Sequence, residues 1–303
     1  MVSDTGPRFV WVDGSVRPAV EMHLSVFDRG FQLGDGVFET LRARGGHVTE
    51  LVEHTARLRR SADGLAIDLP ADVGPLIARG IADLLAVEEL DGADADASVR
   101  ITVSRGPWTS RGLLPPTSVH LVPTIVIQAW PVAPAPADHL ERGLSLVASA
   151  VRRDPSNPIV SLKTTSRADY VYARLEARRA GAEDAVFLTM SGHLSEGTTA
   201  NIFLVRSAPD GVVELATPAL DCAILPGTTR SWLLRWAAVV GLRPVEGWLT
   251  PDELAAASEA FMSSSVAGVL PVTRFNGHPI GSGLPGPWTL RARADREAMF
   301  GTA

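Results

Sequence analysis

A proline-rich segment near the middle of the chain limits the folds that the chain can adopt. Residues 131–137 read Pro-Val-Ala-Pro-Ala-Pro-Ala, and such a run of prolines and small residues forms a semi-rigid spacer. A chain of 303 residues is long enough to build a core on each side of it. We therefore expect an N-terminal α/β domain over residues 1–129, a linker over 130–137 and a C-terminal domain over 138–303.

The two halves differ in their hydrophobic patterns, which together predict an α+β chain. In the first half we expect helices over residues 49–64, with Thr49 as N-cap and Gly64 as the stop, and over 73–90. Strands are expected there over residues 9–12, 37–43, 98–104 and 118–130. In the second half, helices over 166–180 and 229–240 and a capping box from Thr250 to Glu253 alternate with strands over 185–189, 200–205, 212–216, 260–263 and 268–272.

Composition excludes several classes of protein. A net charge of −6 argues against a nucleic-acid or acidic-membrane partner, and no apolar run approaches the roughly 20 residues of a membrane span. The lone Cys222 cannot form an internal disulfide, and it predicts a cytoplasmic location. The His and Cys spacings predict no metal site. Residues 281–286 fit a dinucleotide-binding pattern, but they lie too near the C-terminus for a βαβ unit and predict a turn.

The chain contains 27 arginines but a single lysine, Lys163. A coding bias that replaces surface lysines with arginine explains the arginines, and Lys163 could then be a leftover surface residue. Alternatively, it remains because Schiff-base chemistry needs an amine that can lose its proton, which a guanidinium cannot do. Lys163 follows a stretch expected to be extended, residues 158–162, and precedes the helix expected at 166. The positive end of that helix would favour a neutral amine.

Four other segments carry candidate site residues, and each also has a simpler explanation. Glu196 opens a loop of small residues and could be a solvated carboxylate. Gly227, Thr228 and Thr229 begin a helix, where backbone amides can bind phosphate, but they could also form an ordinary N-cap. Ser265 ends a run of three serines that could be a polar loop, and Arg57 could lie on the exposed face of a basic helix.

Taken together, these segments resemble the class IV aminotransferases, a family that includes D-amino-acid transaminases, branched-chain aminotransferases and 4-amino-4-deoxychorismate lyases. The segment from Asp28 to Glu39 and the Arg57 helix are followed, in the order found in the family, by the other four. These are the Lys163 corner, the Glu196 loop, the Gly227-Thr228-Thr229 turn and the Ser265 segment. The resemblance covers nearly the whole chain and places the only lysine where the family has its own.

The resemblance implies a smaller α/β N-terminal domain and a larger, β-barrel-like, cofactor-binding C-terminal domain. It also implies pyridoxal 5'-phosphate as cofactor, held by Lys163 through a Schiff base, and a homodimer. Glu196 would pair with the pyridine nitrogen, which keeps the ring an electron sink. Leu225 would pack on the ring, and the phosphate would be bound by Arg57, Gly227, Thr228, Thr229 and Ser265.

The substrate residues that the resemblance implies are Phe38, Arg105 and Arg111. D-amino-acid transaminases commonly have tyrosine at the position of Phe38, and the loop from Ser104 to Gly112 contains two arginines but no histidine. Its apolar residues favour a transaminase that moves an amino group between a D-amino acid or (R)-amine and a 2-keto acid. The alternative is a 4-amino-4-deoxychorismate lyase, which Arg167 favours. A branched-chain aminotransferase is less favoured, because the Asn-Tyr pair of those enzymes is missing at residues 167–168.

Overall fold

The computed structural model describes residues 6–132 and 136–300, and the chain divides into two compact units. The first comprises Met1–Ala133, Leu162–Arg167 and Met299–Ala303, and the second comprises Pro134–Ser161 and Ala168–Ala298. The segment that contains Lys163 therefore belongs to the first unit although second-unit residues flank it in sequence. Part of the expected linker, residues 133–135, lies outside the described residues, so the domain boundaries stay a prediction.

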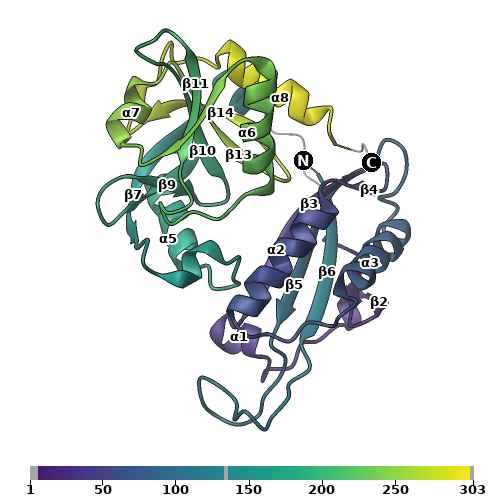
Figure 1. Cartoon of the computed structure of the whole chain (residues 1–303). Helices are drawn as coiled ribbons and strands as arrows, with labels where there is room; N and C mark the ends of the chain where they lie inside the picture. The colour runs from purple at the N-terminus through teal and green to yellow at the C-terminus, as the bar shows by residue number, and fades with distance from the viewer. Residues whose placement is uncertain (1–5, 133–135, 301–303) are drawn as a thin grey trace. The chain divides into compact units, whose positions relative to one another are not determined.

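The first unit is built on a six-stranded antiparallel sheet in the order β2-β1-β6-β5-β3-β4. A turn at Asp13 and Gly14 joins β1 to β2, and both residues have the positive φ that a tight hairpin needs. Helices α2 and α3 cover one face of the sheet (Figure 1). The strands are β1 (Phe9–Val12), β2 (Ser15–Pro18), β3 (Gly36–Arg44), β4 (His47–Val48), β5 (Asp96–Ser104) and β6 (Thr124–Pro131), and the helices are α1 (Arg29–Leu33), α2 (Leu51–Gly64) and α3 (Val73–Val87).

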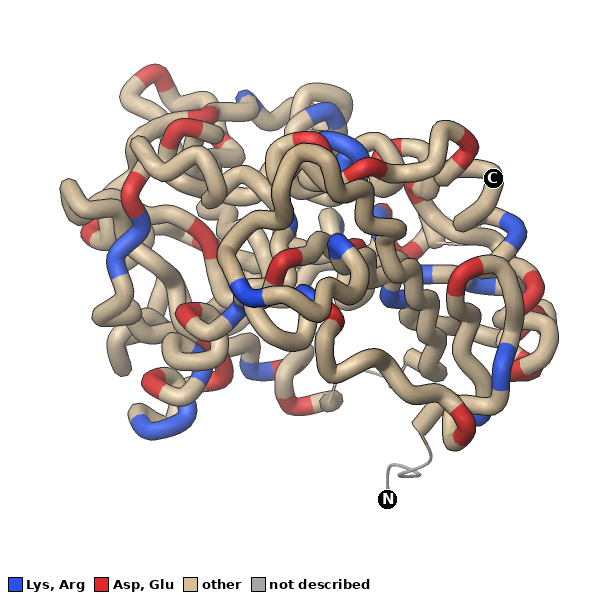
Figure 2. The backbone as a smooth tube through the Cα atoms, turned by 90° about the horizontal axis from the view of Figure 1, so that it is seen from below, with Lys and Arg blue, Asp and Glu red and all other residues tan. Residues whose placement is uncertain are grey.

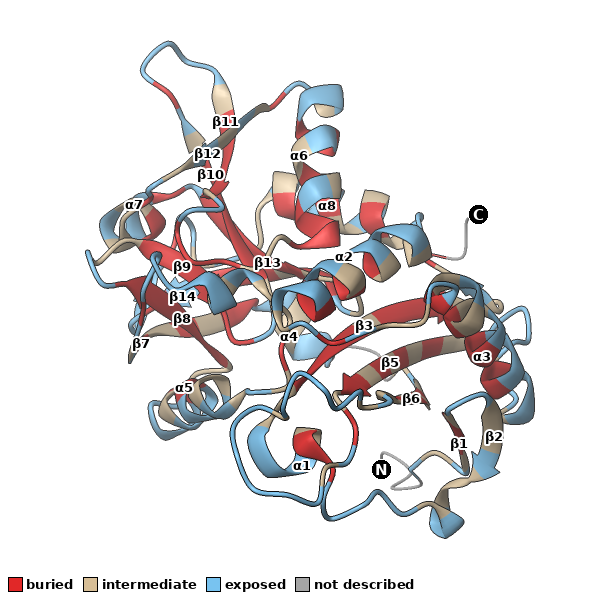
Figure 3. Ribbon diagram, turned by 60° about the horizontal axis from the view of Figure 1, so that its bottom comes forward, coloured by how far each residue is buried: buried red, intermediate tan, exposed pale blue. Residues whose placement is uncertain are grey.

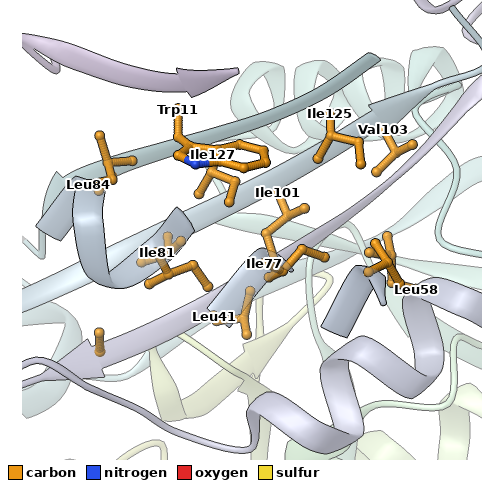
Figure 4. Close-up of a cluster of buried hydrophobic side chains, with 14 of the residues drawn as sticks. Trp11, Leu41, Leu58, Ile77, Ile81, Leu84, Ile101, Val103, Ile125 and Ile127 are labelled. Atoms are coloured by element: carbon orange, nitrogen blue, oxygen red, sulfur yellow. The ribbon is translucent and has the colours of Figure 1, made fainter. Parts of the chain in front are cut away.

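The core of the first unit lies between this sheet and the two helices. Trp11 of β1 packs with Ile127 of β6 and with Ile81 and Leu84 of α3, as Figure 4 shows. The ring approaches the helix closely because Gly80 has no side chain: a Cβ at Gly80 would lie 2.7 Å from Trp11 Cε2. This contact fixes α3 against the sheet.

The second unit contains a nine-stranded mixed sheet that curls on itself. Its order is β12-β11-β10-β13-β14-β7-β8-β9, with β15 paired to β14, and β9 also contacts β10. The strands are β7 (Leu144–Arg153), β8 (Asp184–Thr189), β9 (Leu194–Gly197), β10 (Asn201–Ser207), β11 (Val213–Pro218), β12 (Arg243–Gly247), β13 (Glu259–Ser264), β14 (Gly268–Phe275) and β15 (His278–Pro279). The helices are α4 (Ala137–Glu141), α5 (Ala168–Arg179), α6 (Thr228–Val240), α7 (Pro251–Ala256) and α8 (Pro287–Glu297).

Hydrophobic side chains fill the interior of the curled sheet, and helices cover its outside. Helices α6 and α8 pack over β13 around Phe261, and α5 packs against β7 and β8 around Phe187. In Figure 3 the buried positions concentrate in the strands of both units, whereas α5 is mostly exposed. The α+β architecture with a barrel-like second sheet is as expected from the sequence.

Three local predictions were wrong. Thr49 is not the N-cap of α2, because the helix begins one residue later and Glu50 is its N-cap, with φ 56°. The stretch from Pro158 is a 3-10 turn, Pro158–Ser161, rather than an extended segment, since Asn157 Oδ1 accepts a hydrogen bond from Ile159 N and starts a turn. Helix α5 begins only at Ala168, so Lys163 lies outside its first turn. The positive end of this helix is therefore too far along the chain to favour a neutral amine at Lys163, as had been expected.

Several strand limits also differ from expectation. The strand expected from residue 118 begins at Thr124, after a loop rich in proline and glycine. Strand β7 (Leu144–Arg153) was not expected, because its alternation of polar and apolar residues is weak. The capping box at Thr250 and Glu253 is confirmed, and residues 281–286 form the turn before α8.

Candidate active site

Lys163 is held against β3 and α2 within the first unit. Its carbonyl accepts a hydrogen bond from Phe38 N at 2.9 Å, and its own amide donates to Ser61 Oγ at 3.1 Å. The next residues continue this attachment, because Thr165 N donates to the Gly36 carbonyl at 2.9 Å. Although Lys163 belongs to no helix or strand, its backbone is therefore fixed on both sides.

Three cationic groups lie around the ring of Phe38. Lys163 Nζ lies 4.7 Å from the ring centroid, the Arg100 guanidinium carbon 4.1 Å and that of Arg167 5.7 Å. Burial lowers the pKa of the Arg100 guanidinium, and the charge of Arg167 lowers it further. Such a concentration of positive charge beside an amine favours the binding of an anion, such as a carboxylate.

Sequence analysis missed Arg100. The available signal was an arginine inside an otherwise alternating strand, residues 98–104. Arg100 lies on the side of β5 opposite its fully buried residues Val99 and Ile101, and a charge at such a place usually means exposure. Only the pairing of β5 with β3 brings it to Phe38.

Arg57 lies in a buried network with Glu39 and His54. Its Nε and Nη2 atoms donate to the two carboxylate oxygens of Glu39 at 2.8 and 2.6 Å, and His54 Nδ1 lies 2.7 Å from Glu39 Oε2. Burial alone would raise the pKa of Glu39, but the hydrogen bonds from Arg57 and His54 outweigh it and lower the pKa to about 2. Burial lowers the pKa of His54. The interpretation of Arg57 as part of an exposed helix face is therefore wrong.

Glu196 lies on β9 in the second unit and is a buried carboxylate rather than a solvated loop residue, with 5% of its surface exposed. Its Oε1 atom accepts hydrogen bonds from Arg153 Nη2 at 3.1 Å and from the Tyr170 hydroxyl at 3.3 Å. Its Oε2 atom accepts from the Leu225 amide at 2.9 Å. These three hydrogen bonds fix the direction of the carboxylate.

The start of α6 brings together the residues predicted to bind phosphate in the second unit. Gly227 is the N-cap, Thr228 and Thr229 are the first two helical residues, and Thr228 Oγ1 lies 3.3 Å from Ser265 Oγ. No side chain caps this helix, and a Cβ at Gly227 would collide with Asn201 Oδ1. Amides at an uncapped helix start, beside two hydroxyls, fit a phosphate group. An ordinary side-chain N-cap is thereby excluded.

The two arginines of the predicted substrate loop lie in different surroundings. Arg105 donates two hydrogen bonds to Asp35, at 2.7 and 3.0 Å, and two more to the carbonyls of Leu65 and Ala66. Arg111 is exposed on the loop between β5 and β6. Their substrate-binding roles stay predictions.

The described residues show no large field of one sign of charge. Basic and acidic positions are interspersed along the chain, as Figure 2 shows. Among residues 6–132 and 136–300, no helix is long and apolar enough to cross a membrane. In the same ranges, no three His, Cys, Asp or Glu side chains come together as ligands for a metal ion.

Comparison with known proteins identifies relatives over nearly the whole chain. Residues 36–275 match the family described as amino-transferase class IV. The D-alanine aminotransferase of Bacillus licheniformis is 30% identical over 280 residues, which cover 92% of this chain and 93% of that protein. The branched-chain amino acid aminotransferase of Escherichia coli has a similar structure, with a TM-score of 0.87 and 26% identity over 98% of this chain and 96% of that one. A second branched-chain amino acid aminotransferase, solved with pyridoxamine 5'-phosphate, has a TM-score of 0.86 and 27% identity over 97% of this chain and 94% of that one.

Proposed function

The chain belongs to the class IV aminotransferases, which use pyridoxal phosphate, and from that premise we propose that its amino donor is a D-amino acid or an (R)-amine and its acceptor a 2-keto acid. Pyridoxal phosphate, when bound, supplies an electron sink for the carbon that bears the amino group. The side chains of this chain would carry out the rest of the chemistry.

The residues predicted to bind the cofactor have side chains that suit it. Lys163 is the only lysine in the chain and would both hold the cofactor and carry the proton that the substrate carbon loses. Glu196 would pair with the pyridine nitrogen, because its carboxylate is buried and held in direction beside Arg153. Leu225 would contact the ring. The phosphate would be bound by Arg57, Gly227, Thr228, Thr229 and Ser265.

The arrangement of Arg100 and Arg167 around Phe38, beside Lys163, is the single observation that supports an amino acid substrate. A guanidinium pairs with a carboxylate through charge and through two parallel hydrogen bonds. Arg100 would bind the carboxylate close to the amine of Lys163. Phe38 would form the apolar wall against the substrate side chain, and Arg105 and Arg111 are the other residues predicted to bind the substrate.

A branched-chain L-amino acid is the second candidate donor. It is supported by the similarity to the two branched-chain enzymes of known structure. The D-amino acid is compatible with the similarity to D-alanine aminotransferase, and it is favoured by Arg167 and Ala168, which stand where branched-chain enzymes have Asn-Tyr. The lyase reaction is the third candidate, because Arg167 is also typical of deoxychorismate lyases.

A cytoplasmic homodimer is the proposed state of the enzyme. Large apolar side chains of the first unit are exposed, including Phe31 of α1 and Leu113, Leu114 and Val122 of the loop between β5 and β6. An interface between two copies of the chain would bury these side chains.

Spectra of the holoenzyme with single donors distinguish the three candidates. We expect D-alanine or D-glutamate alone to bleach the long-wavelength band of the bound cofactor, and a 2-keto acid to restore it. Bleaching by L-leucine or L-valine but by no D-amino acid or (R)-amine would instead identify a branched-chain enzyme. Formation of 4-aminobenzoate and pyruvate from 4-amino-4-deoxychorismate, with no bleaching by any donor, would identify a lyase.

A further inference from the structure

A fully buried arginine lies directly behind the start of α6. Arg296, near the end of α8, has 1% of its surface exposed. Its Nη2 atom donates a hydrogen bond to Thr229 Oγ1 at 3.3 Å, and its guanidinium carbon lies 5.3 Å from the ring centroid of Trp232, one turn further along α6. Arg296 therefore packs on the first turn of the helix, at its N-terminal end.

The guanidinium of Arg296 adds positive charge to the start of α6. The N-terminus of a helix carries the equivalent of roughly half a positive charge, and a buried guanidinium against the first turn reinforces it. An anion that binds in front of the helix start is therefore attracted by both the helix and the guanidinium.

The hydrogen bond to Thr229 also determines what that hydroxyl can offer. A threonine hydroxyl has one proton to donate and can accept at its oxygen. Since Thr229 Oγ1 accepts from Arg296, its proton is left to be donated on the other side. A phosphate dianion accepts hydrogen bonds only, so an oriented donor at the second residue of α6 is what such a group needs.

A second buried polar atom lies on the sheet face that α6 covers. Ser263 Oγ has no hydrogen-bond partner among the described residues. Ser263 is two residues along β13 from Phe261, and alternate residues of a strand share a face, so it faces the same helices as Phe261. An unsatisfied buried hydroxyl there is consistent with a polar group that completes this region.

We propose that Arg296 is a positioning residue of the phosphate site, acting through Thr229. It orients the Thr229 hydroxyl as a donor and adds positive charge behind the helix start, so that the chain binds the phosphate of its cofactor more tightly than the amides and hydroxyls alone would. This proposal rests on the proposed function, since it assumes that pyridoxal phosphate binds at α6.

The test compares pyridoxal phosphate with pyridoxal, which lacks the phosphate but can form the same bond with Lys163. Apoenzyme is titrated with each, and dissociation constants are measured from the absorbance of the bound form. Arg296→Met should raise the dissociation constant of pyridoxal phosphate roughly tenfold, the loss expected for one charge-assisted contact. The constant for pyridoxal should change by less than about twofold. Arg291→Met, on the exposed side of the same helix, is the matched control and should change neither.

A pair of variants at Thr229 covers the case in which Arg296→Met does not fold. Thr229→Val should weaken binding of pyridoxal phosphate selectively, and Thr229→Ser should restore it. When Arg296→Lys is added to Thr229→Val, the affinity for pyridoxal phosphate should fall little further, because the hydroxyl through which the cation acts is gone.

Three outcomes would overturn the proposal. These are unchanged affinity for pyridoxal phosphate in Arg296→Met, equal weakening for pyridoxal and pyridoxal phosphate, and fully additive losses at Arg296 and Thr229. If one of these results is found while the wild-type enzyme binds pyridoxal phosphate normally, the proposed function still stands. Wild-type enzyme that binds neither compound would overturn both.

Discussion

At the scale of single residues, Glu39 has the clearest consequences for stability. Its carboxylate is buried and is held ionised by Arg57 and His54, with a pKa of about 2 against an ordinary value of 4.5. A lowered pKa in the folded state means that the unfolded chain takes up this proton first as the pH falls. The stability that Glu39 contributes is therefore complete above about pH 4.5 and is lost as the pH falls towards 2.

Glu39→Gln should destabilise the enzyme by about 3–5 kcal/mol near neutral pH, because it leaves the Arg57 guanidinium buried without its partner. The free energy of unfolding of both proteins, measured by denaturant titration across the acid range, should converge as the pH falls from 4.5 towards 2. Asp138→Asn, at an exposed carboxylate, is the control and should cost little. A Glu39→Gln deficit that stays constant through this range would contradict the assignment.

Glu196→Gln should leave the cofactor bound but slow the half-reaction with the amino donor by roughly a hundredfold or more. The amide keeps the size of the side chain but removes the negative charge that stabilises a protonated pyridine nitrogen. Stopped-flow absorbance gives the rate, and Glu141→Gln, at an exposed glutamate of α4, is the control. An unchanged rate in Glu196→Gln would show that the carboxylate has another role.

The residues that could be predicted from the sequence are those whose neighbours in the chain carry the signal. Lys163 is unique, and Gly227, Thr228 and Thr229 begin an obvious helix. Arg153 and Arg296 give no local signal, and the signal at Arg100, a charge within an alternating strand, usually means exposure. Their roles depend on strand pairing and helix packing, which bring residues from distant parts of the chain together.

At the scale of elements, the stability of α3 depends on the surface that the helix covers. Its two glycines, Gly74 in the first turn and Gly80 in the middle of the helix, have different surroundings. A Cβ at Gly74 would meet only Thr55 Cγ2, at 3.5 Å, whereas a Cβ at Gly80 would meet Trp11 Cε2 at 2.7 Å and Nε1 at 2.9 Å. The same substitution should therefore have opposite effects at the two positions.

Gly74→Ala should stabilise the protein by about 0.5–1 kcal/mol, the helix preference of alanine over glycine. Gly80→Ala should destabilise it by about 1–3 kcal/mol, because the rigid Trp11 ring must move in a packed core. Thermal unfolding of the two variants and the wild type measures the difference. Equal effects at the two positions would mean that α3 does not pack on Trp11 as described.

Elements with strong periodicity or clear end signals, such as α6 and α7, could be predicted from the sequence. The turn at Pro158–Ser161 could not, because its proline and β-branched residues suit an extended chain equally well, and the side chain of Asn157 decides between them. Strand β7 was missed because the alternation of polar and apolar residues along it is weak.

At the scale of the whole molecule, the unit to which Lys163 belongs could not be predicted. The sequence suggests that the chain passes from the first unit to the second only once, near the prolines. Leu162–Arg167 nevertheless belongs to the first unit. Backbone hydrogen bonds to β3 place it there, and no pattern within residues 162–167 specifies them. The overall division into two units follows more simply from length and from the proline-rich segment.

The proposed homodimer gives a prediction at this scale. In analytical ultracentrifugation the enzyme should have twice the 32.2 kDa mass of the chain. Leu113→Asp should shift it towards monomer, since a buried unpaired charge opposes association. Leu113 is 80% exposed in the chain by itself, and Val239→Asp, at a similarly exposed position on α6, is the control. A monomeric wild-type enzyme, or equal effects of the two variants, would contradict the proposed interface.

The most direct test of the central claim is to identify the residue that holds the cofactor. The holoenzyme is reduced with borohydride, which makes the bond between cofactor and amine permanent, and is then digested and mapped by mass spectrometry. The account predicts that Lys163 alone carries the pyridoxyl group, and that Lys163→Arg carries none, because a guanidinium cannot form the bond. A label on the N-terminal amine alone, or no label on the wild-type chain, would contradict it.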